Sequence, residues 1–137
     1  LGRFVVTSNR HALVSAEDLD LLERTLARAA SAHYLVALHH QPVPMGSLWL
    51  DSVPLRNADE FLALCDRHPR IRGIVWGHVH QASDRERHGV RLLSTPSTCA
   101  QFKPASDTFA LDTRPPGYRW LDLREDGSID TTVVWVE

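Results

Sequence analysis

The strongest constraint on the fold of this chain comes from two short, largely apolar runs, each of which comes after a segment with helical spacing. The runs are YLVAL at 34–38 and IRGIVW at 71–76, and a continuous apolar run of this length is typical of a parallel strand covered on both faces. Leucines at helical spacing predict a helix over 16–31, and a second helix is expected from Asn57. With an earlier strand at 3–8, right-handed connections would make the three strands parallel neighbours in a βαβαβ unit.

Both predicted helices begin at residues that favour a helix N-terminus. Ser15 is followed three residues later by Asp18, which resembles a capping box, and Glu60 stands three residues after Asn57. These signals place the start of the first helix after Ser15 and the start of the second after Asn57.

The second half of the chain changes character, because short strand-like segments alternate with turn residues. These segments are GVRLLS at 89–94, TFALD at 108–112, YRWLDL at 118–123 and DTTVVWV at 130–136. Asp126-Gly127 between the last two is a strong hairpin signal. We therefore predict an α/β fold in which the βαβαβ unit is followed by an antiparallel β meander.

Length, composition and charge narrow the class of protein. A chain of 137 residues with 43% hydrophobic and 23% charged residues is expected to form a single globular domain. The formal net charge of −2, with both signs interspersed, argues against a nucleic-acid partner. No apolar run approaches the roughly 18 residues of a membrane span. We expect a cytoplasmic protein without a membrane partner, in which Cys65 and Cys99 are free thiols.

Three histidines follow the two apolar runs directly. His39 comes after 34–38, and His78 and His80 come after 71–76, with Gly77 permitting a sharp turn between strand and histidines. If these strands are parallel, all three imidazoles emerge at the same carboxyl edge, where open α/β sheets place ligand sites. Imidazole nitrogen binds zinc, iron, manganese and cobalt ions. The sequence therefore predicts a metal site formed by His39, His78 and His80, with solvated side chains at strand ends as the alternative.

The other polar residues near this edge are harder to interpret. Two divalent ions about 3.5–4 Å apart need bridging anionic ligands, yet neither Asp51 nor Asp84 occupies an evident bridging position. His40 is a candidate for binding substrate through a phosphate, and a packing role is the alternative. Phe102 and Lys103 could contact a base and a phosphate, but a structural loop is an equally good interpretation.

Three segments resemble the calcineurin-like metallophosphoesterases. LHHQPVPMGSLWLD at 38–51, IVWGHVHQ at 74–81 and LLSTPSTCAQFKP at 92–104 are similar to the C-terminal half of that family, and more closely to the bacterial class III 3′,5′-cyclic-AMP phosphodiesterases of the CpdA or Icc type. The resemblance covers nearly the whole chain. It implies a four-layer αββα sandwich with a dinuclear metal centre, and it implies hydrolysis of 3′,5′-cyclic AMP to 5′-AMP.

The resemblance also implies roles for individual residues. His39 and His78 match histidines that hold one metal ion, and His80 matches a histidine that holds the second. The Asp-x-His motif, the bridging aspartate and the Gly-Asn-His segment of the family have no counterpart here. The catalytic residues are therefore unknown in this chain, and the two divalent ions could be iron, manganese, zinc or cobalt.

These absences predict that residues 1–137 are the C-terminal portion of one metallophosphoesterase domain, whose N-terminal half is missing. A start at Leu1, with Met45 as the only methionine, agrees with that interpretation. We expect the isolated chain to bind metal weakly and to hydrolyse little. The alternatives for the full-length protein are a metallophosphoesterase acting on another phosphodiester or a monoester, and a non-catalytic assembly module.

A sandwich that lacks half of its strands exposes sheet edges and apolar faces, which promote association. We therefore predict that the isolated chain self-associates. Sedimentation of the chain at micromolar concentration tests this prediction, and a monodisperse monomer would contradict it.

Overall fold

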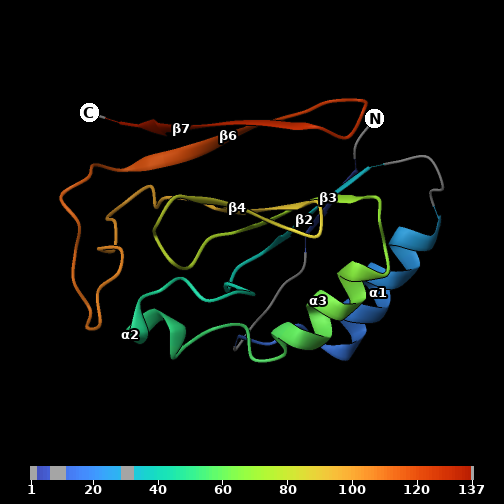
Figure 1. Ribbon diagram of the computed structural model, residues 1–137, viewed down its shortest axis with the longest axis horizontal. Coiled ribbons are helices and arrows are strands. Elements are labelled where there is room, and N and C mark those ends of the chain that lie inside the picture. The colour runs from blue at the N-terminus through green and yellow to red at the C-terminus, as the bar shows by residue number, and fades with distance from the viewer. Residues whose placement is uncertain (1–2, 7–11, 29–32, 137) are drawn as a thin grey trace.

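The computed structural model describes residues 3–6, 12–28 and 33–136, and its largest element is a five-stranded sheet (Figure 1). The strands lie in the order β1-β2-β3-β5-β4 across the sheet. Their bounds are β1 Arg3–Val6, β2 Tyr34–Leu38, β3 Ile71–Trp76, β4 Ser83–Arg87 and β5 Val90–Ser94. β1, β2, β3 and β5 are parallel, and β4 is antiparallel to β5. The predicted βαβαβ unit is thus confirmed.

Helices and a hairpin cover the two faces of the sheet. α1 (Ala16–Arg28) and α3 (Ala58–Asp66) lie on one face, and the hairpin of β6 (Gly117–Leu123) and β7 (Ile129–Trp135) lies on the other (Figure 1). Among the described residues the layers are therefore helix, sheet and hairpin. A fourth layer, as in the expected αββα sandwich, is not seen in this part of the chain.

Apolar side chains join these layers into two clusters. The larger cluster lies between the helices and the sheet and includes Leu22, Leu26 and Phe61, each at most 1% exposed. The smaller cluster lies under the hairpin and consists of the buried residues Leu35, Val75, Leu93 and Ile129. Because β2 and β3 send buried side chains to both clusters, their sequences are continuously apolar rather than alternating.

The N-terminal signals of the two helices have different outcomes. The Ser15 hydroxyl accepts a hydrogen bond from the Asp18 N–H at 3.1 Å, as a helix cap does. Asn57 also stands at the cap position of its helix, but its side chain makes no cap hydrogen bond. Instead its amide group pairs with both the N–H and the carbonyl of Val14, at 3.1 and 2.9 Å. Asn57 therefore ties the start of α1 to the start of α3.

Several sequence-based predictions need correction. The segment 108–112 is not a strand, and Phe102 and Leu111 form only an isolated bridge there. The segment 89–94 supplies β5, which is antiparallel to β4 but also parallel to β3, so it belongs to the main sheet and not to a separate meander. β4 was missed because an exposed edge strand of charged residues carries no apolar alternation. α2 (Leu48–Asp51) was missed because it is a single turn.

The remaining boundaries agree closely. Strands 34–38 and 71–76 have the predicted bounds, whereas residues 7–8 and 29–31 of the first predicted strand and helix lie outside the described residues. The hairpin turn at Asp126-Gly127 is confirmed. Gly127 has a φ of +85°, and a Cβ at this position would lie 2.7 Å from the His33 ring, so glycine is required there.

Three further predictions concern the surface and the thiols. Cys65 is buried and Cys99 exposed, and both are free. None of the described helices has the length and apolar character needed to span a bilayer. Among the described residues, β1 and β4 form the two edges of the five-stranded sheet, and the exposed charged residues of β4 protect its edge from pairing. Self-association stays a prediction.

Candidate metal centre

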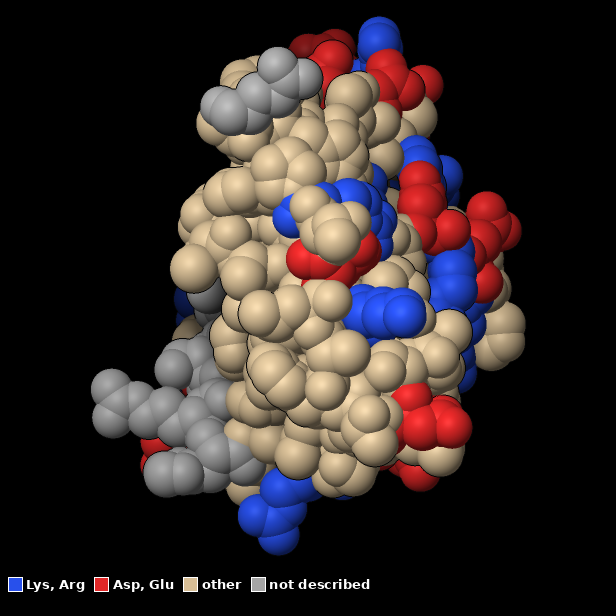
Figure 2. All heavy atoms as spheres, turned by 90° about the vertical axis from the view of Figure 1, so that its left-hand side faces the viewer, with Lys and Arg blue, Asp and Glu red and all other residues tan. Residues whose placement is uncertain are grey.

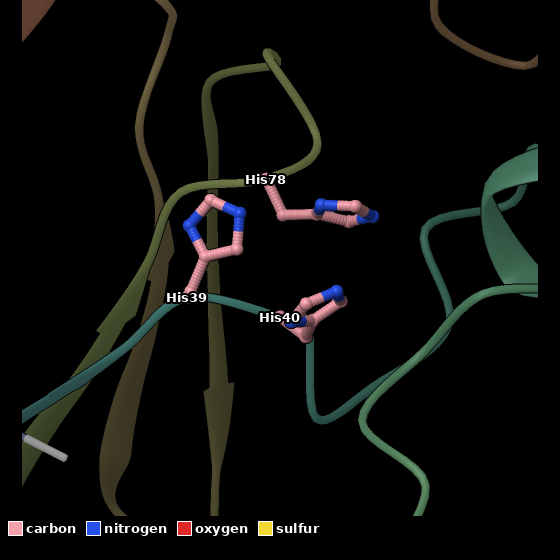
Figure 3. A group of neighbouring side chains, drawn as sticks. All are labelled: His39, His40 and His78. Atoms are coloured by element: carbon pink, nitrogen blue, oxygen red, sulfur yellow. The ribbon is translucent and has the colours of Figure 1, made fainter. Parts of the chain in front are cut away.

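The register of β2 and β3 brings His39 and His78 together. Leu38 pairs with Trp76 at the ends of the two parallel strands. His39 therefore leaves the sheet beside the segment that carries His78, at the carboxyl edge (Figure 3). This confirms the predicted placement of these two residues at one edge.

His39, His40 and His78 form a compact group. Their ring centroids are 5.0 Å apart for His39 and His40, 5.2 Å for His39 and His78, and 4.2 Å for His40 and His78. One ring nitrogen from each lies within 4.8 Å of the other two. Nitrogens that share a tetrahedral zinc ion are about 3.4 Å apart, so small side-chain rotations would let the three bind one ion. His40, predicted to contact substrate or to have a packing role, belongs to this group.

The backbone around His78 adopts an uncommon conformation. His78 has a φ of +48° and His80 a φ of +47°, both in the left-handed region. Val79 between them is fully buried, and its N–H donates to the Gly77 carbonyl. Strained non-glycine residues of this kind cluster at functional sites. The expected role of Gly77 is wrong: its φ is not positive, and a Cβ there would make only an ordinary 3.7 Å contact with His39.

Burial keeps the imidazole of His78 neutral. Desolvation, followed by the nearby His40, His39 and His80, lowers the pKa of His78 to about 4. Desolvation and His39 also lower the pKa of His40. The neutral form is the one that binds metal ions. His78 Nε2 is buried and has no hydrogen-bond partner among the residues described, which is costly for a polar atom unless a ligand satisfies it.

His80 lies next to this group but is held differently. Its Nδ1 is 2.8 Å from the Ala100 carbonyl, and its ring stacks on Phe102 with centroids 4.1 Å apart and planes 7° from parallel. An Nδ1–H donated to a carbonyl leaves Nε2 with a free lone pair, as in many metal-binding histidines. The structure does not place His80 among the three grouped histidines. Sequence reasoning missed the contacts that orient its ring.

The nearby carboxylates are engaged elsewhere. The Asp51 carboxylate accepts hydrogen bonds from the backbone N–H groups of Met45 and Gly46, at 2.7 and 2.9 Å. Asp84 forms an ion pair with Arg91. Within the described part of the chain, no carboxylate joins the histidine group. The residues present therefore fit part of a dinuclear site, because its bridging anionic ligand is not among them.

Gln41 connects the histidines to α2 and was not predicted. Its side chain is fully buried, and its Nε2 donates to the Leu50 carbonyl at 2.7 Å. The main-chain carbonyl of Gln41 accepts a hydrogen bond from the Leu55 N–H at 2.9 Å. These bonds fix the turn that follows His40 against α2. The sequence signal for Gln41 was its position, directly after two histidines and directly before Pro42. This position looks like a surface loop, in which a glutamine side chain is ordinarily exposed.

Known proteins resemble this chain over most of its length. No protein-family model matches the chain. The 3′,5′-cyclic adenosine monophosphate phosphodiesterase CpdA of Pseudomonas aeruginosa is 46% identical over 121 residues, which are 88% of this chain and 44% of that protein. The CpdA of Escherichia coli strain K12 is 46% identical over 123 residues, or 90% of this chain and 45% of that protein. This chain is homologous to part of the CpdA-type phosphodiesterases.

The chain spans less than half the length of the CpdA relatives that it matches. Among solved structures, a dimetal phosphatase from Danio rerio has a TM-score of 0.56 and 15% sequence identity, covering 88% of this chain and 38% of that one. At this identity the likeness shows the fold alone. The α/β sheet with its hairpin thus resembles part of a dimetal phosphatase.

Proposed function

We propose that this chain supplies the histidine-bearing part of a metal-dependent phosphodiesterase, which hydrolyses 3′,5′-cyclic AMP to 5′-AMP in the full-length protein. The observation that carries the proposal is the group of His39, His40 and His78 at the carboxyl edge. The buried Nε2 of His78, which has no hydrogen-bond partner among the described residues, supports it, as does the homology to CpdA proteins. We also propose that the full-length protein is a calcineurin-like metallophosphoesterase with a four-layer αββα sandwich.

Each histidine has a proposed role. His39 and His78 hold one divalent ion, and His80 holds a second through the nitrogen that its bond to Ala100 leaves available. When bound, two such ions lower the pKa of a water molecule and neutralise charge on the phosphoryl oxygens. Histidine ligands suit iron, manganese, zinc or cobalt, and nothing in this donor set selects one.

His40 is the residue we assign to the substrate phosphate. Its ring lies 4.2 Å from that of His78, so it reaches the same space. The lowered pKa of His40 keeps its imidazole neutral, and a neutral imidazole has one N–H that can donate to a phosphoryl oxygen. A place in the ligand set of the first metal ion is the alternative that the short nitrogen distances favour.

The proposal is tested by turnover of three substrates with the full-length protein in Mn²⁺. We expect cyclic AMP to be hydrolysed with the highest kcat/KM, compared with cyclic GMP and bis(p-nitrophenyl) phosphate. We expect the isolated 137-residue chain to show little turnover, because its described histidine group lacks a carboxylate. Preference for the aryl diester or a monoester would indicate another metallophosphoesterase. Absence of turnover in the full-length protein with bound metal would indicate a non-catalytic module.

A further inference from the structure

An aromatic cluster extends from the histidine loop toward the surface. Phe102 stacks on His80 and contacts the rings of Trp49 and Phe109 edge to face, with centroids 5.0 and 5.5 Å away. Trp49 and Phe109 also contact each other, at 5.3 Å. Trp49 comes from α2, and Phe102 and Phe109 come from the connection between β5 and β6. Segments that are distant in sequence therefore converge beside the candidate metal centre.

Phe109 is the exposed end of this cluster. Its side chain is 61% exposed, so its ring adds little to the buried core. The residues on either side of Phe109 are nevertheless hydrogen-bonded: before it, the Ser106 hydroxyl donates to the Thr108 carbonyl at 2.7 Å, and after it, two bonds join residues 110 and 112 to the segment 101–103. The Lys103 N–H donates to the Ala110 carbonyl at 2.9 Å, and the Asp112 N–H donates to the Gln101 carbonyl at 2.9 Å. Gln101 is itself fully buried and hydrogen-bonded to Ser97 and Pro115. A fixed, exposed aromatic ring is a feature of ligand sites.

Figure 2 shows the side of the molecule where α2 and the connection before β6 lie. Residues other than Lys, Arg, Asp and Glu cover most of this side, with a group of charged side chains near its middle. In Figure 3 the His40 and His78 rings point toward the side where the helix α2 lies. An anionic ligand on this face would meet imidazoles and bound metal at one end and aromatic rings at the other.

We propose that the exposed ring of Phe109, which Trp49 contacts edge to face, is a stacking platform for the purine base of a nucleotide whose phosphate lies at the histidine group. The inference rests on the proposed function and specifies its substrate class. Bases stack on aromatic side chains with a gain that corresponds to roughly tenfold or more in affinity per base. Ring contacts run from His80 through Phe102 to Phe109, and His80 lies two residues after His78 in the same loop, so the aromatic cluster begins beside the histidine group.

The test compares two ligands that differ only in the base. Calorimetry measures the dissociation constants of 5′-AMP and ribose 5-phosphate for the full-length protein equilibrated with Mn²⁺. We expect 5′-AMP to bind roughly tenfold tighter. In Phe109→Ala this ratio should fall toward one while ribose 5-phosphate binds as before, and Phe109→Trp should retain the ratio. Trp120→Ala is the matched control, because Trp120 is 65% exposed but lies on the hairpin β6.

The outcomes separate the two proposals. Equal affinities in the unmodified protein, or a ratio that Phe109→Ala leaves unchanged, would overturn the platform and leave the phosphate site intact. If neither ligand binds, the proposed function fails and the platform fails with it. Because Phe109 is exposed, its replacement should leave the melting temperature unchanged, which shows that a lost ratio does not reflect unfolding.

Discussion

Replacing His78 with alanine should weaken Zn²⁺ binding to this chain by at least about 100-fold. Loss of a residue that merely orients a metal ligand already costs about 10–100-fold in affinity, and His78 is placed to bind directly. Its ring is neutral, its Nε2 is buried, and that atom has no hydrogen-bond partner in the described residues. Competition with a chromophoric zinc chelator at pH 7 measures the change.

The matched control for this experiment is His88→Ala. His88 also has a left-handed φ, of +52°, but its side chain is 71% exposed and lies beside Asp66, away from the histidine group. We expect Zn²⁺ affinity to be unchanged in this variant. Equal losses in the two variants would mean that surface imidazoles bind the metal nonspecifically, and the candidate centre would then be rejected.

The parts of the fold that sequence predicts well are those with an independent local signal. β2 and β3 have the expected bounds because their residues are buried on both faces and loop residues follow them. β4 has no such signal. It is a strand because its backbone pairs with β5 after a tight turn. Its exposed charged side chains give no sequence pattern from which that pairing could be predicted.

The segment 108–112 shows the opposite error. Its composition favours a strand, yet Phe109 and Leu111 are 61% and 58% exposed, and the segment folds back on residues 101–103 as a short loop. Propensity for a strand has effect only where a neighbouring strand offers hydrogen bonds and a buried face. The sequence around residues 108–112 does not indicate whether a neighbouring strand or a buried face is available to them.

The candidate site was predictable where it depends on sheet topology and not where it depends on loop paths. Parallel pairing of β2 with β3 suffices to bring His39 and His78 together. The inclusion of His40 depends on the turn that Gln41 fixes against α2. The orientation of His80 depends on Ala100 and Phe102, which are distant in sequence. Side-chain contacts between loops leave no periodic pattern from which they could be inferred.

The metal-free chain should lose stability as the pH falls from 6.5 toward 4, and His78 should account for about 3 kcal/mol of that loss. Burial lowers the pKa of His78 from 6.5 to about 4, so the folded state binds a proton there less readily than the unfolded state. The stabilisation is fully present above pH 6.5, where both states are neutral. It diminishes below that pH, because protons bind the unfolded chain first, and it is lost once the pH passes through the folded pKa.

Urea unfolding of the wild type and of His78→Asn at intervals between pH 7 and pH 4 isolates this contribution. Asparagine is uncharged throughout this range and tolerates the left-handed backbone of residue 78. The carboxylates of Glu23 and Asp66, whose pKa values are lowered by His68 and Arg87 respectively, lose their stabilisation at lower pH in both proteins. They therefore cancel in the difference. The difference in unfolding free energy between the proteins should shrink by about 3 kcal/mol from pH 7 to pH 4; parallel pH profiles would show that His78 is not desolvated in the folded chain.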